Sequence, residues 1–333
     1  MLAINTKKFT DRKGICKVWL SYLLIPTFDG VGCAILAKLA FGEDVDIEYC
    51  NYDDINDKVK DFWANYCRDR NIREKYEHVF ITDISITEEL AEKINISSLF
   101  EHITLLDHHP TALGLNKFYW CKVAVSNSLE MKTSGTELFY LYLFFNYRFN
   151  DNIDSNESLE KFVPIVRDYD TWRWSILGED GVICKQVNDL LYIYGIDYFI
   201  EWCLNKIYDE TFPKLNDEDY FVLHIKQQEI DKYIEEKDKT MFTGALCGRT
   251  CGFVFADRYF SELGNKLCTM HPEIDFVAMI DIDDCTVSYR TIKDDIDLGK
   301  NVAAKFGGGG HPKAAGSEFS VDVQFKTIEK IFS

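Results

Sequence analysis

The sequence predicts an α/β protein in which a parallel-sheet domain is joined by a helical connector to a smaller α/β domain. Three observations predict this class. The first half alternates apolar runs of strand length with amphipathic stretches of helix length. The middle of the chain has a mostly helical pattern, and further strand-like segments follow it. With 333 residues, the chain is long enough for about two domains with cores of their own.

The first half is expected to form the parallel sheet. Parallel strands are buried on both faces, so they need no alternation of apolar and polar residues. The expected strands are Lys17 to Ile25, Val45 to Tyr49, His78 to Thr82, His102 to Leu106 and Lys117 to Val125. The expected helices between and after them are Cys33 to Phe41, Ile55 to Arg70, Glu88 to Lys93 and Gly135 to Phe145.

The second half is expected to hold the connector and the smaller domain. A helical pattern runs from about Ser158 to Asp238, and its charged end, Lys226 to Lys239, is interpreted as the solvated face of a connecting helix. The strands expected beyond it are Leu246 to Phe255, Phe276 to Asp281 and Thr286 to Arg290, with a helix from Leu298 to Lys305. These patterns divide the chain into residues 1–190, 191–240 and 241–333.

Charge and cysteine usage exclude several classes of function. The 37 basic and 55 acidic residues give a formal net charge of −18, which repels phosphate backbones and disfavours binding of long duplex nucleic acid. The 11 cysteines contain no C-x-x-C pair and are typical of free thiols in a reducing cytoplasm. The apolar run Val18 to Phe28 is too short to span a bilayer, so no membrane partner is expected.

Acidic side chains follow three of the expected strands. Asp29, Asp83 and Asp107 each come at or just after a strand end, where ligands bind in open parallel sheets. A single such carboxylate is more often a helix cap, but three at one edge favour a binding site. Asp107 also begins the run Asp107-His108-His109, and mixed carboxylate and imidazole ligands suit Mn²⁺, Fe²⁺, Co²⁺ or Zn²⁺ better than Ca²⁺.

A second candidate site is the run of four glycines followed by His311, at residues 307–311. Four glycines lose much backbone entropy on folding, so an ordered role requires close approach of the backbone or positive φ. Backbone N–H groups in such a loop can bind an anion. A flexible linker is the alternative, but residues 286–313 carry five basic side chains against three acidic ones in an otherwise acidic chain.

Together these motifs resemble the DHH superfamily of phosphoesterases, the RecJ-like enzymes with a DHH-associated C-terminal domain. The markers are FDGVGCAILAKLAFG at 28–42, FITD at 80–83, LLDHHPTAL at 105–113, VRDYDTW at 166–172 and GGGGH at 307–311. SELGNKL at 261–267 and RTIKDDID at 290–297 look most similar to the oligoribonuclease branch called nanoRNase B. The resemblance implies a DHH catalytic domain in residues 1–190 and a substrate-binding domain in residues 241–333.

The resemblance also implies roles for individual residues. The family holds two metal ions, usually Mn²⁺, and the matching ligands here are Asp29, the bridging Asp83, His108 and Asp170. The resemblance makes Asp107 the carboxylate that orients His108, and gives His109 a contact with phosphate or a part in proton transfer. The substrate's terminal nucleotide would be held by the C-terminal domain, through Arg290, Gly308, Gly309, Gly310 and His311.

The first motif departs from the family pattern. Similar proteins have His-x-Asp-x-Asp-Gly, whereas this chain has Ile25 and Thr27 at the positions of the histidine and the first aspartate. Isoleucine cannot bind a metal, and a threonine hydroxyl is a weak ligand. We therefore expect one well-formed metal site and a second that is weak, empty or built differently.

The expected function is metal-dependent hydrolysis of short single-stranded RNA or dinucleotides to nucleoside 5′-monophosphates. Ile25 and Thr27 keep a different class open, a nucleotide-binding relative that has lost turnover. Related phosphate chemistry also remains open, such as hydrolysis of cyclic dinucleotides, other nucleotide phosphates or pyrophosphate. Pyrophosphate is the least favoured substrate, because a glycine loop that binds nucleotides would have little to hold.

Overall fold

A computed structural model describes residues 17–147 except 23–26, together with 149, 156–323, 326, 329 and 330. The chain divides into two compact units, residues 1–223 and residues 224–333. The boundary between them falls inside a long helix, α9 (Asp217–Asp238). The three-part division at residues 190 and 240 stays a prediction.

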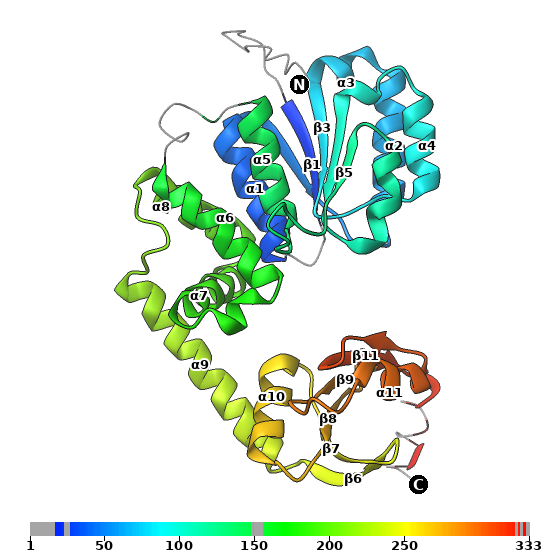
Figure 1. Cartoon of the computed structure of the whole chain (residues 1–333), viewed down its shortest axis with the longest axis vertical. Helices are drawn as coiled ribbons and strands as arrows, with labels where there is room; N and C mark the ends of the chain where they lie inside the picture. Colours follow the sequence, from blue (N-terminus) through cyan, green and yellow to red (C-terminus); the bar gives the residue numbers. More distant parts are fainter. Residues whose placement is uncertain are drawn as a thin grey trace. The chain divides into compact units, whose positions relative to one another are not determined.

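The first unit is built on a five-stranded sheet with the order β2-β1-β3-β4-β5. Figure 1 labels β1, β3 and β5 of this sheet. All of its neighbouring strands are parallel, which confirms the predicted α/β class. The strands are β1 (Lys17–Tyr22), β2 (Val45–Tyr49), β3 (Tyr76–Thr82), β4 (Ile103–Asp107) and β5 (Cys121–Val123). Short 3₁₀ turns occur at Gly42–Asp44, Phe100–His102 and Pro110–Lys117.

Helices cover both faces of this sheet (Figure 1). One face packs on α1 (Phe28–Phe41) and α5 (Gly135–Asn146), and the other on α2 (Ile55–Arg68) and α4 (Glu88–Ile96), with the short α3 (Arg70–Lys75) after α2. Alternate residues of β3 point to opposite faces, so Phe80 belongs to the first core while Val79 and Ile81 belong to the second. Burial on both faces explains why most of β4 and the end of β3, Val79 to Ile81, are apolar without alternation.

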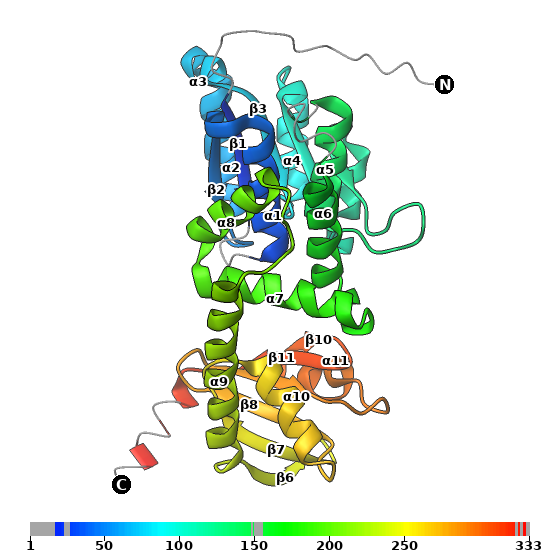
Figure 2. The same cartoon turned by 90° about the vertical axis from the view of Figure 1, so that its left-hand side faces the viewer.

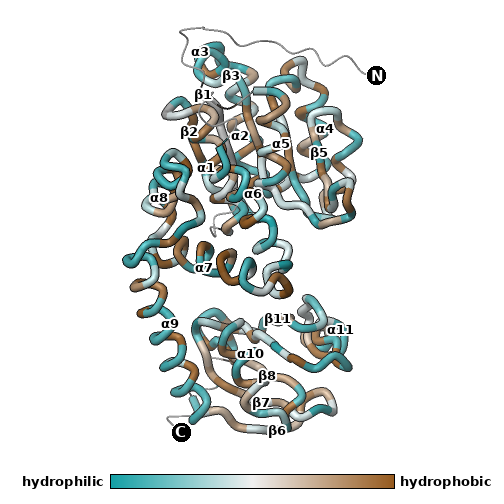
Figure 3. Tube along the Cα trace, turned by 60° about the vertical axis from the view of Figure 1, so that its left-hand side comes forward, coloured by the Kyte–Doolittle hydropathy of each residue, from teal (hydrophilic) through white to brown (hydrophobic). Residues whose placement is uncertain are grey.

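Three more helices, α6 (Glu157–Asp170), α7 (Glu179–Tyr194) and α8 (Ile196–Tyr208), extend the core on the side of α1 (Figure 2). A 3₁₀ turn at Arg173–Ile176 joins α6 to α7. Helix α9 mixes hydrophobic and hydrophilic residues along its length (Figure 3). Its Val222 and Leu223 pack on the core of the first unit, and its Ile230 and Ile234 belong to a core of the second.

The second unit contains a six-stranded sheet with the order β10-β11-β9-β8-β7-β6. Only β7 and β8 are parallel neighbours, and the other pairs are antiparallel. The strands are β6 (Phe242–Leu246), β7 (Arg249–Phe255), β8 (Phe276–Asp281), β9 (Thr286–Arg290), β10 (Gly309–Gly310) and β11 (Ala314–Glu318). Among its helices are α10 (Phe260–Met270) and α11 (Leu298–Asn301), and a 3₁₀ turn follows α11 at Ala303–Phe306.

Several expected elements have different bounds. The strand expected over Leu246 to Phe255 begins only at Arg249, as β7, because Cys247 and Gly248 both have positive φ and form the tight turn of a β6–β7 hairpin. Helix α1 begins five residues earlier than expected, because Thr27 caps it at Phe28. The strand expected over Lys117 to Val125 shortens to β5, since Lys117 ends a 3₁₀ helix and residues 118–120 form a bend and a turn before the strand.

No helix in the described ranges is long and apolar enough to cross a membrane.

Candidate metal centre

The predicted ligands meet at the carboxyl edge of the first sheet, each delivered by a different element. Asp83 follows β3 directly, and His108 follows β4. Asp29 lies in the first turn of α1, and Asp170 is the last residue of α6. Because parallel strands end at the same edge, residues up to 141 positions apart in sequence converge there.

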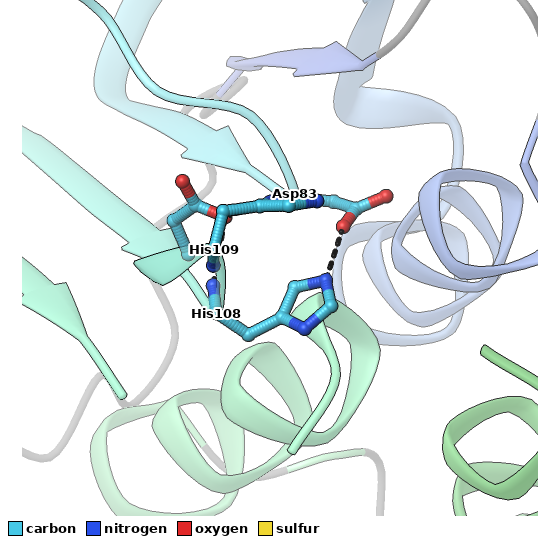
Figure 4. Close-up of side chains that lie close together, drawn as sticks. Asp83, His108 and His109 are labelled. Atoms are coloured by element: carbon cyan, nitrogen blue, oxygen red, sulfur yellow. Dashed lines mark hydrogen bonds and ion pairs between the residues drawn. The ribbon is translucent and has the colours of Figure 1, made fainter. Parts of the chain in front are cut away.

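One imidazole nitrogen faces all three of these carboxylates. His108 Nε2 lies 3.2 Å from Asp83 Oδ1, 3.5 Å from Asp29 Oδ2 and 3.7 Å from Asp170 Oδ2. Figure 4 shows the His108 ring turned toward the Asp83 carboxylate. Asp29 and Asp83 are almost fully buried, with exposed fractions of 1% and 2%. We call these four side chains the acidic cluster.

Asp29 is fixed by the N-terminus of α5. Its Oδ2 accepts a hydrogen bond of 2.6 Å from Gly135 N, and its Oδ1 accepts one of 2.8 Å from Thr136 N. The Thr136 hydroxyl also donates to the backbone carbonyl of Asp29. A helix N-terminus favours negative charge, so these bonds hold a buried carboxylate in a single orientation.

Asp83 is held in an unusual backbone conformation. Its φ is +60°, a left-handed value that aspartate adopts more easily than most residues. Its backbone N–H donates to Leu106 O at 3.0 Å, and its Oδ2 accepts a hydrogen bond from the Thr27 hydroxyl at 3.2 Å. A Cβ added at Gly135 would lie only 2.7 Å from Asp83 Cβ, so this close approach requires glycine.

Among the described residues, the basic groups near the acidic cluster offset its negative charge only partly, since Lys132, His108 and His109 lower the pKa of Asp170 less than burial and Asp29 raise it. Burial, and then the negative charge of Asp29, raise the pKa of Asp83 well above its usual range and that of Asp170 to about 7. Within the described residues, no lysine or arginine forms an ion pair with the cluster. Ligand atoms of Asp29, His108 and Asp170 lie within 4.8 Å of one another, as do those of Asp83, Asp107, His108 and His109. This donor set fits a divalent cation.

Asp170→Asn is expected to stabilise the metal-free protein near neutral pH. The pKa of the Asp170 carboxyl rises from 3.8 to about 7 on folding. The unfolded chain therefore loses the carboxyl proton at a lower pH than the folded chain does. Stability is therefore lost as the pH rises from about 4 to 7, and a neutral asparagine avoids that loss. Urea denaturation in EDTA should show the variant to be more stable than the wild type at about pH 8 and equal to it near pH 4.

The matched control for that experiment is Asp168→Asn, two positions earlier on α6. The Asp168 carboxylate pairs with Arg167 at 2.9 Å and with Arg173 at 3.1 Å, so its removal should lower stability at pH 8. An Asp170→Asn variant less stable than the wild type at pH 8 would contradict the expected desolvation cost. The structure thus separates the two aspartates of this motif, because Asp170 alone faces the other ligands.

Asp107 has a different side-chain partner from the one expected. Its Oδ1 accepts a 2.7 Å hydrogen bond from the ring of His109, and it reaches His108 only through the backbone N–H, also at 2.7 Å. Its Oδ2 accepts a hydrogen bond from Ser85. Burial alone would raise the pKa of Asp107, but the hydrogen bonds from His109 and Ser85 lower it, while Asp107 raises the pKa of His109. Asp107 therefore orients His109 rather than the ring of His108.

The first motif, which differs from the family pattern, is described only in part. Ile25 lies outside the described residues. Thr27 caps α1, where its Oγ1 accepts a 3.0 Å hydrogen bond from Gly30 N while the same hydroxyl donates to Asp83. At this position the family pattern has a metal-binding carboxylate, but the hydroxyl here is used to start a helix and to hold Asp83.

The glycine run lies in the second unit and forms an ordered hairpin. Strand β10 pairs with β11, and His311 N donates to Ala314 O at 2.8 Å. A Cβ at Gly308 would lie 2.0 Å from Gly316 O, and Gly310 has a φ of +136°, so both positions need glycine. A Cβ at Gly309 would meet no atom within 4 Å, so a ligand could approach the backbone there.

Arg290 and the lysines near the hairpin are less available than the sequence suggests. The Arg290 guanidinium donates to Tyr289 O at 2.9 Å and to Ser261 Oγ at 3.2 Å. Burial lowers its pKa. Three lysines near the hairpin form ion pairs with aspartates, namely Lys293, Lys300 and Lys313. The positive charge counted in the sequence is therefore largely neutralised in the structure.

Sequence patterns missed two contributors to the acidic cluster's surroundings. Tyr52, in the loop after β2, places its ring at right angles to that of His109, with centroids 6.4 Å apart. Gly135 supplies both an N–H to Asp29 and the space that Asp83 needs. Neither residue belongs to a recognisable motif, and their contacts bridge 57 and 106 positions of sequence.

One known protein is similar in sequence to most of this chain. The chain is 35% identical to oligoribonuclease NrnB of Bacillus subtilis (strain 168) over 310 residues, which cover 91% of this chain and 74% of the relative. No model of a protein family matches the sequence.

Two solved structures show a similar fold at low sequence identity. The crystal structure of exonuclease RecJ bound to manganese superposes with a TM-score of 0.52 at 13% identity, covering 94% of this chain and 88% of that one. The pGpG-specific phosphodiesterase PggH from Vibrio cholerae superposes with a TM-score of 0.50 at 14% identity, covering 95% and 97% of the two chains.

Proposed function

Since the chain belongs to the DHH phosphoesterases and to the family of oligoribonuclease NrnB, we propose that it hydrolyses short oligoribonucleotides or dinucleotides to nucleoside 5′-monophosphates. The observation that carries this proposal is the convergence of Asp29, Asp83 and Asp170 on one nitrogen of His108. A buried cluster of this kind, without a lysine or arginine partner in the described chain, is costly unless a metal ion compensates it.

The acidic cluster would hold one divalent ion, and we propose Mn²⁺. Three carboxylates and one imidazole form a mixed oxygen and nitrogen donor set, which suits manganese better than calcium. A bound divalent ion would supply positive charge beside the scissile phosphate and acidify a water molecule. A second ion would have fewer ligands, because Thr27 offers only a hydroxyl that is already hydrogen-bonded.

Asp107 and His109 would act on the substrate as a pair. The Asp107 carboxylate accepts the hydrogen bond from Nδ1 of His109, which leaves Nε2 as the nitrogen that can reach a phosphate oxygen or transfer a proton. Ser85 and two backbone N–H groups hold the Asp107 carboxylate in turn. These contacts fix the orientation of the His109 ring before substrate arrives.

The second unit would bind the substrate's terminal nucleotide through the β10–β11 hairpin. The open space at Gly309 supports contact between this backbone and a ligand, and His311 lies next to it on the exposed turn. Arg290 would contribute a positive charge from the neighbouring strand β9. We assign Gly308 and Gly310 to shaping the hairpin rather than to contacting the substrate.

The substrate should be short and the setting cytoplasmic. A formal net charge of −18 opposes the binding of a long duplex, whereas a dinucleotide carries few charges. Every cysteine in the described part of the chain is a free thiol, as in proteins of a reducing compartment.

Incubation of the purified protein with a diadenylate and Mn²⁺ is expected to release AMP, measured by liquid chromatography. A reaction with EDTA in place of Mn²⁺ serves as the control and should give none. Binding of the diadenylate without cleavage under every divalent ion would instead support the second candidate, a nucleotide-binding relative without turnover. That alternative is favoured by one observation, the use of Thr27 as a helix cap where a metal ligand would otherwise lie.

A further inference from the structure

A pocket in the first unit borders the acidic cluster, and we propose that it binds the nucleoside on one side of the scissile phosphate, with Tyr52 as its stacking surface. The inference rests on the proposed function, and it assigns a substrate-binding role to Tyr52 and Asn56, which lie outside the motifs of the sequence. The pocket has a volume of about 370 Å³, within the usual range of about 300 to 1,000 Å³ for small-molecule sites.

The position of the pocket ties it to the reaction. Asp107 and His109 form part of its wall, and together with Asp83 and His108 they form a group of side chains that could hold a metal ion. The rings of His108 and His109 are adjacent, with centroids 4.3 Å apart. A phosphate bound at the acidic cluster would therefore have an attached nucleoside within reach of this pocket.

Tyr52 offers an aromatic face at the pocket. Its side chain is exposed to 59%, and its ring meets that of His109 edge-on, so a large part of its surface is open to a base. Asn51 fixes the loop, because its Oδ1 accepts hydrogen bonds of 3.0 Å from Asp53 N and Asp54 N. Stacking of a base on such a ring contributes about 1 to 3 kcal/mol, equivalent to roughly a 5- to 150-fold change in affinity.

Polar groups in the wall suit a sugar or a base. The Oδ1 atom of Asn56 accepts a 2.8 Å hydrogen bond from Thr87 N, which fixes the amide, and its Nδ2 has no hydrogen-bond partner among the described residues. Thr111 adds an exposed hydroxyl to the same wall. These groups can pair with ribose hydroxyls or with acceptors on a base.

The charges of the wall favour a neutral occupant over a second phosphate. Glu88 is paired with Lys117, and the Asp107 carboxylate accepts hydrogen bonds from Ser85 and His109. A phosphate would meet both of these carboxylates, whereas a nucleoside carries no charge. Apolar side chains of Ile86, Ala112 and Leu115 complete the lining. The chemistry therefore points to a nucleoside.

Adenosine and a diadenylate provide separate tests with the full chain. We expect Tyr52→Ala to weaken the binding of adenosine, titrated by NMR in EDTA, by about tenfold, and to raise KM for the diadenylate by a similar factor with kcat little changed. Tyr52→Phe, which keeps the ring, should retain most of the affinity. Tyr119→Ala is the matched control, because Tyr119 is 96% exposed and does not line the pocket, and it should match the wild type.

The outcomes separate this inference from the proposed function. Equal adenosine affinities for Tyr52→Ala and Tyr119→Ala, or no binding of adenosine to the wild type, would overturn the nucleoside pocket even if the diadenylate is cleaved. Selective loss of adenosine binding in Tyr52→Ala would support the pocket even if no substrate is hydrolysed. Unchanged circular dichroism and melting temperature would confirm that each variant is folded.

Discussion

Asp83→Asn is expected to lower kcat for hydrolysis of a diadenylate by more than about 100-fold, since even partners that merely orient metal ligands cost about 10- to 100-fold when removed. Asp83 lies at the centre of the acidic cluster, 3.2 Å from His108 Nε2 and 3.2 Å from the Thr27 hydroxyl. Asparagine keeps the size of the side chain and tolerates the φ of +60°, so the change removes charge without disturbing the backbone. Steady-state kinetics and calorimetric titration with Mn²⁺ measure the two effects.

The control for this experiment is Asp168→Asn, a buried aspartate of the same unit that pairs with Arg167 and Arg173 instead of the ligands. It should lose stability but keep its affinity for Mn²⁺. Activity of Asp83→Asn within threefold of the wild type would reject the acidic cluster as the catalytic metal site. His108→Ala is expected to behave like Asp83→Asn, because it removes the imidazole on which the three carboxylates converge.

Gly135→Ala is expected to lower the free energy of unfolding by about 1 to 3 kcal/mol, the usual cost of overpacking a buried site. The new Cβ would lie 2.7 Å from Asp83 Cβ and 2.9 Å from Asp83 Cα. Alanine favours a helix over glycine by about 1 kcal/mol, but the clash is with backbone that cannot rotate away. Because Gly135 N also holds Asp29, the variant should bind Mn²⁺ more weakly as well.

Gly316→Ala provides the comparison, since a Cβ there would lie at an ordinary 3.5 Å from Val287 O. Urea denaturation of both variants and calorimetric titration with Mn²⁺ give the two readouts. Equal stability of the Gly135 and Gly316 variants would show that the contact between α5 and Asp83 can relax. In that case the position of Asp83 would have to depend on Thr27 and on the backbone bond to Leu106 instead.

The Asp83→Asn and Gly135→Ala variants test different properties of the same site. Asp83 supplies charge to the acidic cluster, whereas Gly135 determines where that charge lies. Loss of metal affinity in both, with loss of stability mainly in Gly135→Ala, would support a centre whose geometry is set by the packing of α5 against the end of β3. This packing also explains why the first turn of α5 carries a glycine where most residues would favour the helix more.

The sequence by itself determined the parallel sheet of the first unit and the edge at which its acidic residues gather. Apolar runs of strand length, three of them followed by a carboxylate, are local patterns, and the topology of parallel strands brings their ends together without further information. This topology groups Asp29, Asp83 and Asp107 at one edge, and the resemblance to the DHH phosphoesterases adds His108 and Asp170 as ligands. The structure places Asp29, Asp83 and Asp170 around His108.

Only the tertiary structure determined which groups the side chains around the acidic cluster contact. The Asp107 carboxylate binds the ring of His109, Thr27 serves as a helix cap, and Tyr52 stands beside His109. The tight turn at Cys247 and Gly248 likewise depends on positive φ values that an apolar run does not reveal. The physical reason is that hydrophobic periodicity records only whether a residue is buried, whereas hydrogen bonds and ring contacts depend on distances of a few ångströms between residues far apart in the chain.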